Sequence, residues 1–338
     1  MQSDPVLDRR QLLRLAAAAA ASGALLRNGW SQPRLADDPF AAGVASGSPT
    51  DTSIVLWTRL LGARLPAGPV TVRWELAQDE GFARIVQRGD AQALPALAHS
   101  VHVELQGLAP DRPYFYRFVA GGWMSPAGRT RTLPAPDAAV QRLRLAYASC
   151  QRWEHGWFSA WRHLRADDPD LVLFLGDYLY EYPGAARAVR PVRGGWLLTL
   201  DDYRDRHALY KSDPDLQAMH RACPWLFTWD DHEVQNDYAG EQEGQAGPAV
   251  TDFPARRAAA YQAWYEHMPV PASMLTRGLE GLADGRGLRI YGERRFGRLA
   301  QLLLLDGRQY RSPRPSARPS RPRVSMLAGT GMCSYQAW

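Results

Sequence analysis

The sequence predicts an antiparallel β-sandwich followed by an α/β domain. Between residue 37 and about residue 132, short alternating apolar runs are separated by Gly, Pro and Asp, a pattern typical of antiparallel strands. From about residue 140 the chain instead alternates continuous apolar runs with helical stretches, as expected for a buried sheet flanked by helices. With 338 residues, of which 46% are apolar, the chain is long enough for two such cores.

Residues 1–36 have the features of an export signal. Arg9 and Arg10 precede a weakly apolar run, residues 15–26, that is too short to span a bilayer. This leader resembles a twin-arginine signal, so we expect the twin-arginine machinery to export the protein to the periplasm or the medium. We expect no transmembrane anchor. The alternative is an Ala-rich amphipathic first helix, which the apolar character on all sides disfavours.

The net charge of +5 is unevenly distributed. Residues 1–36 have a net charge of +3 and residues 311–323 a net charge of +5, which leaves −3 for the rest of the chain. A nucleic-acid-binding domain needs its positive charge on a folded face, so we expect no specific nucleic-acid recognition. The three cysteines do not form a disulfide framework, which leaves one of them open to another role.

The first domain, residues 37–135, is expected to be an immunoglobulin- or fibronectin-like sandwich. It contains no cluster of metal-ligand side chains, and we expect its neighbouring histidines, His99 and His102, on an exposed strand face. A Pro- and Ala-rich linker follows at residues 133–139. The predicted strands are Ser53–Thr58, Val70–Leu76, Val101–Leu105 and Tyr114–Val119.

The second domain, residues 140–310, is expected to have a core of buried strands. The helical stretches are residues 200–222 and 253–267, and Trp157, Trp161 and Leu164 recur at helical spacing before them. The predicted strands are Leu143–Ala148, Asp170–Leu175, Leu226–Trp229 and Leu299–Leu305.

Metal-ligand residue types follow each of these strands. Cys150 follows the first, Asp177 and Tyr180 the second, the run Asp230–Glu233 the third and Asp306 the fourth. Open α/β sheets build their sites at these strand ends. Taken singly, an Asp can cap the next helix and a Cys can be a small buried apolar residue. The run from Asp230 to Glu233 is harder to explain, because its three carboxylates repel one another unless a cation or arginines offset them.

Together these residues predict a site for more than one metal ion. A carboxylate such as Asp177 can bridge two cations, a thiolate and a phenolate favour a ferric-type ion, and further carboxylates suit Ca²⁺ or Mn²⁺. Two such ions lower the pKa of a bound water and hold both reacting oxygens of a phosphate ester. His232 could hydrogen-bond a phosphate oxygen or protonate the leaving alkoxide.

The sequence resembles the alkaline phosphatase D (PhoD-like) family of calcineurin-like metallophosphatases. The resemblance covers about nine tenths of the chain. It implies α/β/β/α layers in the second domain and hydrolysis of phosphomonoesters and phosphodiesters. The segments that carry it are residues 43–49, 55–59, 148–151, 176–181, 200–204, 208–214, 228–234 and 305–310.

The resemblance also implies roles for individual residues. Cys150, Asp177 and Tyr180 are expected to bind Fe³⁺, with Asp177 also bridging to Ca²⁺. Binding of other divalent metals in place of these ions is the alternative. Asp231 takes the position of a metal-binding Asn, His232 faces the substrate, and Asn236 is a calcium-site or substrate contact.

Residues 311–338 form an Arg/Pro-rich tail that we expect to be disordered. The resemblance implies a late Gly-Asp-x-His element with further metal ligands, and this sequence has no His after His267. We therefore expect an α/β domain that is incomplete at the C-terminus, reduced activity, and a monomer. The alternative is a non-catalytic exported relic or binding protein built on the same domains. Ester or peptide hydrolysis of other kinds is disfavoured, because the sequence has no Gly-x-Ser-x-Gly or His-Glu-x-x-His motif.

Overall fold

The computed structural model describes residues 34–274 and 288–313. The expected export leader and the expected disordered tail lie almost wholly outside the described residues. Within the part of the chain that is described, no helix is both long and apolar enough to cross a membrane.

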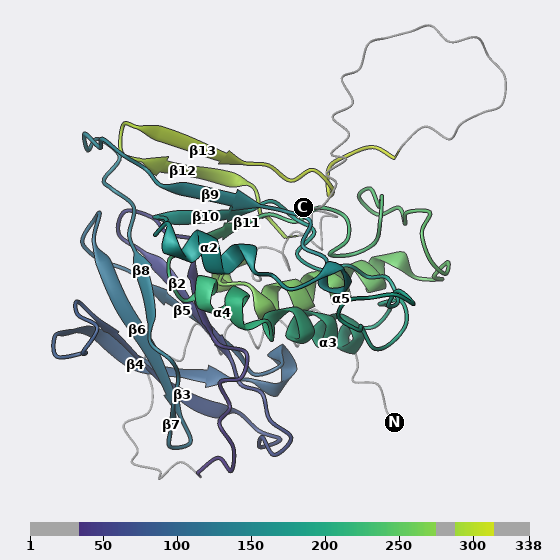
Figure 1. Ribbon diagram of the computed structural model, residues 1–338, viewed down its shortest axis with the longest axis horizontal. Coiled ribbons are helices and arrows are strands. Elements are labelled where there is room, and N and C mark those ends of the chain that lie inside the picture. Colours follow the sequence, from purple (N-terminus) through teal and green to yellow (C-terminus); the bar gives the residue numbers. More distant parts are fainter. Residues whose placement is uncertain (1–33, 275–287, 314–338) are drawn as a thin grey trace, which may run out of the picture.

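The N-terminal part is a β-sandwich, as predicted (Figure 1). One sheet contains β5 (Ser100–Leu105), β2 (Ile54–Arg59) and β1 (Val44–Gly47) in that order. The other has the order β4 (Ile85–Ala93), β3 (Val70–Ala77), β6 (Pro113–Ala120) and β7 (Trp123–Met124), and β8 (Gly128–Arg131) pairs with β6. All four predicted strands are present. The sequence prediction missed β1, β4, β7 and β8, of which β4 is mostly exposed or half-buried and so lacks a clear apolar pattern.

The first sheet of the sandwich continues into the α/β part of the chain. Its order is β5-β2-β1-β11-β10-β9, where β9 (Leu145–Ala148), β10 (Leu171–Phe174) and β11 (Trp225–Phe227) are parallel. β1 joins β11 in parallel through the pair Gly47 and Trp225, and the Ser48 amide donates to the Trp225 carbonyl at 3.0 Å. A side chain at position 47 would clash, because a Cβ there would lie 2.4 Å from the Pro269 carbonyl oxygen.

Helices cover one face of the parallel part of this sheet, and a β-hairpin lies along the other face of that part (Figure 1). The helices are α2 (Ala160–Ala166), α3 (Leu200–Lys211), α4 (Pro214–His220) and α5 (Phe253–His267), and the hairpin pairs β12 (Gly292–Phe296) with β13 (Ala300–Leu304). The predicted bounds of α5 are correct. The predicted stretch 200–222 is instead two helices, because Asp213 caps a new helix and Pro214 cannot continue the old one. The helix around Trp161 begins only at Ala160 and leaves Trp157 exposed.

α5 packs against the sandwich strands. The His102 ring stacks on Tyr265 with centroids 4.4 Å apart, and its Nε2 lies 3.0 Å from the carbonyl oxygens of Tyr265 and Met268. The expectation that His102 lies on an exposed strand face is therefore wrong. The face of β5 that carries it is covered by a helix 163 residues further along the chain.

Lys211, the only lysine of the sequence, is buried at this junction. Its Nζ lies 4.5 Å from the centre of the Trp57 ring and 3.4 Å from Nε2 of His220. Burial lowers the pKa of Lys211 to about 7. Burial and the nearby Lys211 charge hold the pKa of His220 well below its usual value.

Candidate active site

The polar residues after β9 and β10 adopt an unusual backbone. Cys150 and Asp177 have φ angles of 57° and 55°, in the left-handed region that non-glycine residues rarely occupy. Gly176, between β10 and Asp177, has φ 103°, and a Cβ at this position would lie 2.3 Å from the Asp230 amide nitrogen. Such strained positions are concentrated at functional sites. The tight turn brings Asp177 beside the loop that follows β11.

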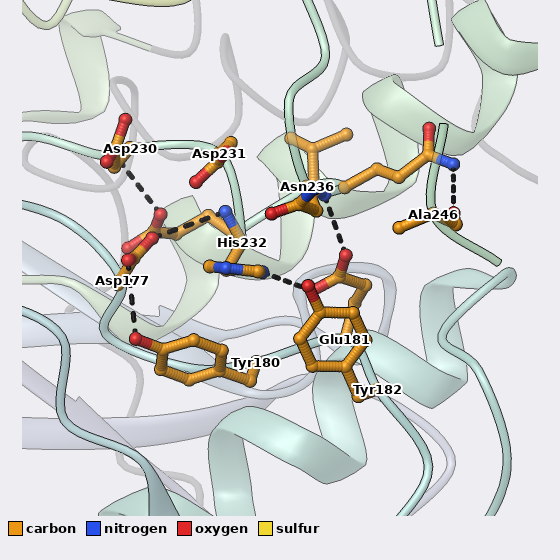
Figure 2. Close-up of polar contacts among 12 residues, drawn as sticks. Asp177, Tyr180, Glu181, Tyr182, Asp230, Asp231, His232, Asn236 and Ala246 are labelled. Carbon is orange, nitrogen blue, oxygen red and sulfur yellow. Dashed lines mark hydrogen bonds and ion pairs between the residues drawn. The ribbon is translucent and has the colours of Figure 1, made fainter. Parts of the chain in front are cut away.

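Two proton donors converge on one oxygen of Asp177, and Figure 2 shows one of them, Tyr180. The Cys150 thiol and the Tyr180 hydroxyl each donate to Asp177 Oδ2 at 3.3 Å. Burial raises the pKa of Cys150 to about 11, and the Asp177 charge contributes to the rise. Burial also raises the pKa values of Tyr180 and Asp177. Thiol and phenol therefore keep their protons here, and only a cation would draw both into the charged form.

Asp231 and His232 complete this cluster from the loop after β11. One ligand-type atom each of Asp177, Asp231 and His232 lies within 4.8 Å of the others, and all three residues are buried. The His232 amide donates to Asp177 Oδ1 at 3.4 Å. Three donors at this spacing fit a metal ion, and Cys150 and Tyr180 add a soft thiolate and a phenolate to the set.

Glu181 fixes the orientation of the His232 ring (Figure 2). Its Oε2 lies 2.7 Å from His232 Nδ1, and its Oε1 accepts from the Asn236 amide at 2.7 Å. Burial alone would lower the pKa of His232, but the hydrogen bond to Glu181 and the charges of Glu181, Asp177 and Asp231 outweigh burial and raise it to about 9. The ring is thus held by Nδ1, with its Nε2 edge left for other partners.

Glu233 lies beside the cluster and holds two loops together. It is fully buried and accepts from the amides of Tyr178 at 2.7 Å and Asp230 at 2.9 Å. Burial raises the pKa of Glu233. Of the acidic run that follows β11, this residue is therefore structural.

Arg308 offsets the charge of the remaining aspartates. Its Nε lies 2.6 Å from Asp230, its Nη2 3.2 Å from Asp231 and its Nη1 3.8 Å from Asp237. These acids were expected to need a cation or an arginine beside them, and the sequence alone did not point to Arg308. The only available signal was its position after the strand that ends at Leu304.

An aromatic rim borders the cluster. The rings of Tyr180 and Tyr182 lie with centroids 4.3 Å and 5.0 Å from the His232 ring, and Tyr182 meets Trp196 edge-on at 5.2 Å. Arg206, from α3, donates to the carbonyl oxygens of Tyr180 and Tyr182 and so holds this segment. Of these rim residues, only Tyr180 was predicted from the sequence.

The structure brings Cys150, Asp177, Tyr180, Asp231 and His232 together, although they come from three separate segments. Asn236 reaches the site through its backbone amide, which bonds Glu181. A ligand or substrate role for the Asn236 side chain stays a prediction.

Comparisons with known proteins agree with this fold. Residues 145–333 match the family described as PhoD-like phosphatase, and residues 24–134 match the PhoD-like phosphatase N-terminal domain. The chain therefore belongs to the PhoD-like phosphatase family.

Two relatives show how much of the family architecture the chain contains. It is 46% identical over 300 residues to alkaline phosphatase D of Bacillus subtilis (strain 168), a match that covers 86% of this chain and 50% of the relative. A solved structure described as the structure of PhoD matches with a TM-score of 0.78 and 46% identity, over 84% of this chain and 55% of that one. The chain thus spans about half the length of these relatives, and the predicted fold class is confirmed.

Proposed function

We propose that this protein is a metal-dependent phosphoesterase that hydrolyses phosphomonoesters and phosphodiesters. The observation that carries the proposal is the convergence of the Cys150 thiol and the Tyr180 phenol on one oxygen of Asp177, beside Asp231 and His232. A relative 46% identical is an alkaline phosphatase, which supports the same reaction class.

Cys150, Asp177 and Tyr180 would hold Fe³⁺, because thiolate and phenolate donors suit a ferric ion. Asp177 would bridge to Ca²⁺, with Asp231 and Asn236 on the calcium side; another divalent ion is the alternative. When bound, such ions supply a water of lowered pKa and stabilise charge on the phosphate oxygens.

His232 would act on the substrate. Glu181 anchors its Nδ1 at 2.7 Å, so the opposite edge of the ring can hydrogen-bond a phosphate oxygen or donate a proton to the leaving alkoxide. Tyr180 and Tyr182 pack against the ring and limit its rotation. In this role His232 is a catalytic residue, and Glu181 is a positioning residue.

We propose further that the protein is exported folded through the twin-arginine route and works as a monomer outside the cytoplasm. The leader-like sequence of residues 1–36 supports export. The proposed organisation remains a sandwich domain of residues 37–135 and a phosphatase domain of residues 140–310.

The test is hydrolysis of p-nitrophenyl phosphate and bis-p-nitrophenyl phosphate by the purified chain, with iron and calcium supplied. Asp177→Asn should reduce turnover by more than about a hundredfold, because it removes the bridging carboxylate. Asp137→Asn, in an exposed turn, should leave it unchanged. A wild-type chain that neither binds metal nor hydrolyses either ester would contradict the proposal and favour a non-catalytic exported protein.

A further inference from the structure

Arg152 lies at the rim of the site, outside the acid cluster. It follows Cys150 by two residues, just after β9. Its guanidinium carbon lies 5.4 Å from the centre of the Tyr180 ring and 5.2 Å from the centre of the Tyr182 ring. His232 contacts the same two rings. A guanidinium and an imidazole therefore share one pair of tyrosines.

Arg152 keeps hydrogen-bonding capacity that the neighbouring arginines have used. Arg308 is occupied by three aspartates, and Arg206 is buried against backbone carbonyls. Arg152 has 23% of its side chain exposed, and its contacts with Glu154 are long, at 3.4 and 3.5 Å. A guanidinium has five N–H donors in a fixed plane, so two long contacts leave donors for an incoming anion.

We propose that Arg152 is a substrate-binding residue that donates to a non-bridging oxygen of the phosphate group. The inference rests on the proposed phosphoesterase function. The carboxylates of Asp177, Asp230 and Asp231 repel a phosphate, so a fixed positive charge at the tyrosine rim lowers the cost of bringing it in. The two tyrosine rings hold the guanidinium in place before substrate arrives, and guanidinium–phosphate pairs are strong and directional.

The proposal predicts a difference between substrate classes. At alkaline pH a phosphomonoester carries two negative charges and a phosphodiester carries one. The loss of a cation therefore weakens monoester binding more than diester binding. A purely structural role for Arg152 would affect both substrates equally.

The test must separate binding from folding, because Glu154 is buried and loses its ion-pair partner when Arg152 alone is replaced. We therefore compare Glu154→Gln, which keeps Arg152, with the double variant Arg152→Ala/Glu154→Gln, which leaves no buried charge unpaired. Arg64→Ala, at an exposed ion pair with Asp37, is the surface control. Circular dichroism and thermal unfolding establish that each full-length variant is folded.

Two measurements are made on the metal-loaded chain: KM and kcat for the two p-nitrophenyl esters, and calorimetric binding of inorganic phosphate. Relative to Glu154→Gln, the double variant should raise the monoester KM about tenfold or more, with a smaller change for the diester and for kcat. Phosphate binding should weaken in parallel, and millimolar guanidinium should restore part of it. Arg64→Ala should match wild type.

Equal KM values and equal phosphate affinity in the two Glu154→Gln backgrounds would overturn the role of Arg152 while leaving the proposed function intact. A wild-type chain that hydrolyses neither ester would overturn both. If the double variant does not fold, the same two measurements are made on Arg152→Lys. This variant keeps the positive charge but loses the planar set of donors. An unchanged monoester KM and an unchanged phosphate affinity would count against the proposal.

Discussion

The guanidinium of Arg308 lies 3.2 Å from the carboxylate of Asp231, whose side chain is 8% exposed. The same arginine reaches Asp230 and Asp237, so one positive charge serves three acids. Without a bound cation, the positive charge of Arg308 compensates much of the negative charge on the loop that follows β11.

Arg308→Ala should therefore destabilise the metal-free protein. Breaking a buried pair leaves Asp231 uncompensated, which we expect to lower the free energy of unfolding by about 3 kcal/mol. Urea unfolding in EDTA and in excess calcium measures the effect, which should be smaller with calcium because a bound cation takes over part of the compensation. Arg308→Lys should lower the free energy of unfolding less than Arg308→Ala does. Equal stability of wild type and Arg308→Ala in EDTA would contradict the assignment.

Tyr180 should give the iron-loaded protein a visible colour. If its phenolate binds Fe³⁺, the protein shows a tyrosinate-to-iron absorption band, and Tyr180→Phe should abolish the band. Tyr182→Phe is the matched control, because this neighbouring tyrosine shares the rim but makes no contact with Asp177 among the interactions described above. Absorption spectra of the iron-reconstituted variants test this prediction. A band that persists in Tyr180→Phe would contradict the assignment of Tyr180 as an iron ligand.

Glu181→Gln should lower kcat with a smaller effect on KM. The amide keeps the size of Glu181 and can still accept from the Asn236 amide, but it removes the charge beside His232 Nδ1. Loss of such an orienting partner costs about tenfold to a hundredfold in activity. Steady-state kinetics at several pH values test this prediction. An unchanged kcat across the range would show that Glu181 does not position His232.

Lys211 should make the protein more stable as pH rises. Burial lowers its pKa to about 7 from an ordinary 10.5, so between these values the unfolded chain holds a proton that the folded chain has lost. Stability therefore rises from pH 7 towards pH 10.5 and falls as the pH drops back, with a slope from this group of up to about 1.4 kcal/mol per pH unit.

Lys211→Met should flatten this dependence, which urea unfolding at pH 7 to 10 measures directly. Because Lys211 is the only lysine, ¹³C-lysine labelling gives a single resonance whose titration reports its pKa. A midpoint near 10.5 in the folded protein would contradict the prediction, as would parallel stability curves for wild type and variant.

Local patterns predicted much of the architecture. The bounds of α5 were predicted correctly, and the structure shows that local features mark its start: the Asp252 cap and Pro254 in the first turn. Cys150, Asp177 and Tyr180 could be grouped because the ends of parallel strands meet at one edge of a sheet.

Long-range partners were not predictable in this way. Arg308 bonds Asp230 across 78 residues and His102 contacts Tyr265 across 163, and neither polar side chain carries a periodic signal. The role of Glu181 could not be predicted either, because its hydrogen bond to His232 forms only when the two segments, 51 residues apart, fold together. β4 was missed because its apolar and polar residues do not alternate regularly along the strand.

The continuous six-stranded sheet has a consequence for how the molecule comes apart. β1 and β11 are hydrogen-bonded neighbours in this sheet, paired at residues 47 and 225. In addition, α5, which follows the linker, packs against β5, which precedes it. Heating should therefore melt the two halves in one cooperative transition. If the chain were cleaved between residues 133 and 139, each fragment would have an unpaired strand edge. The two fragments would have to re-associate to regain the native core.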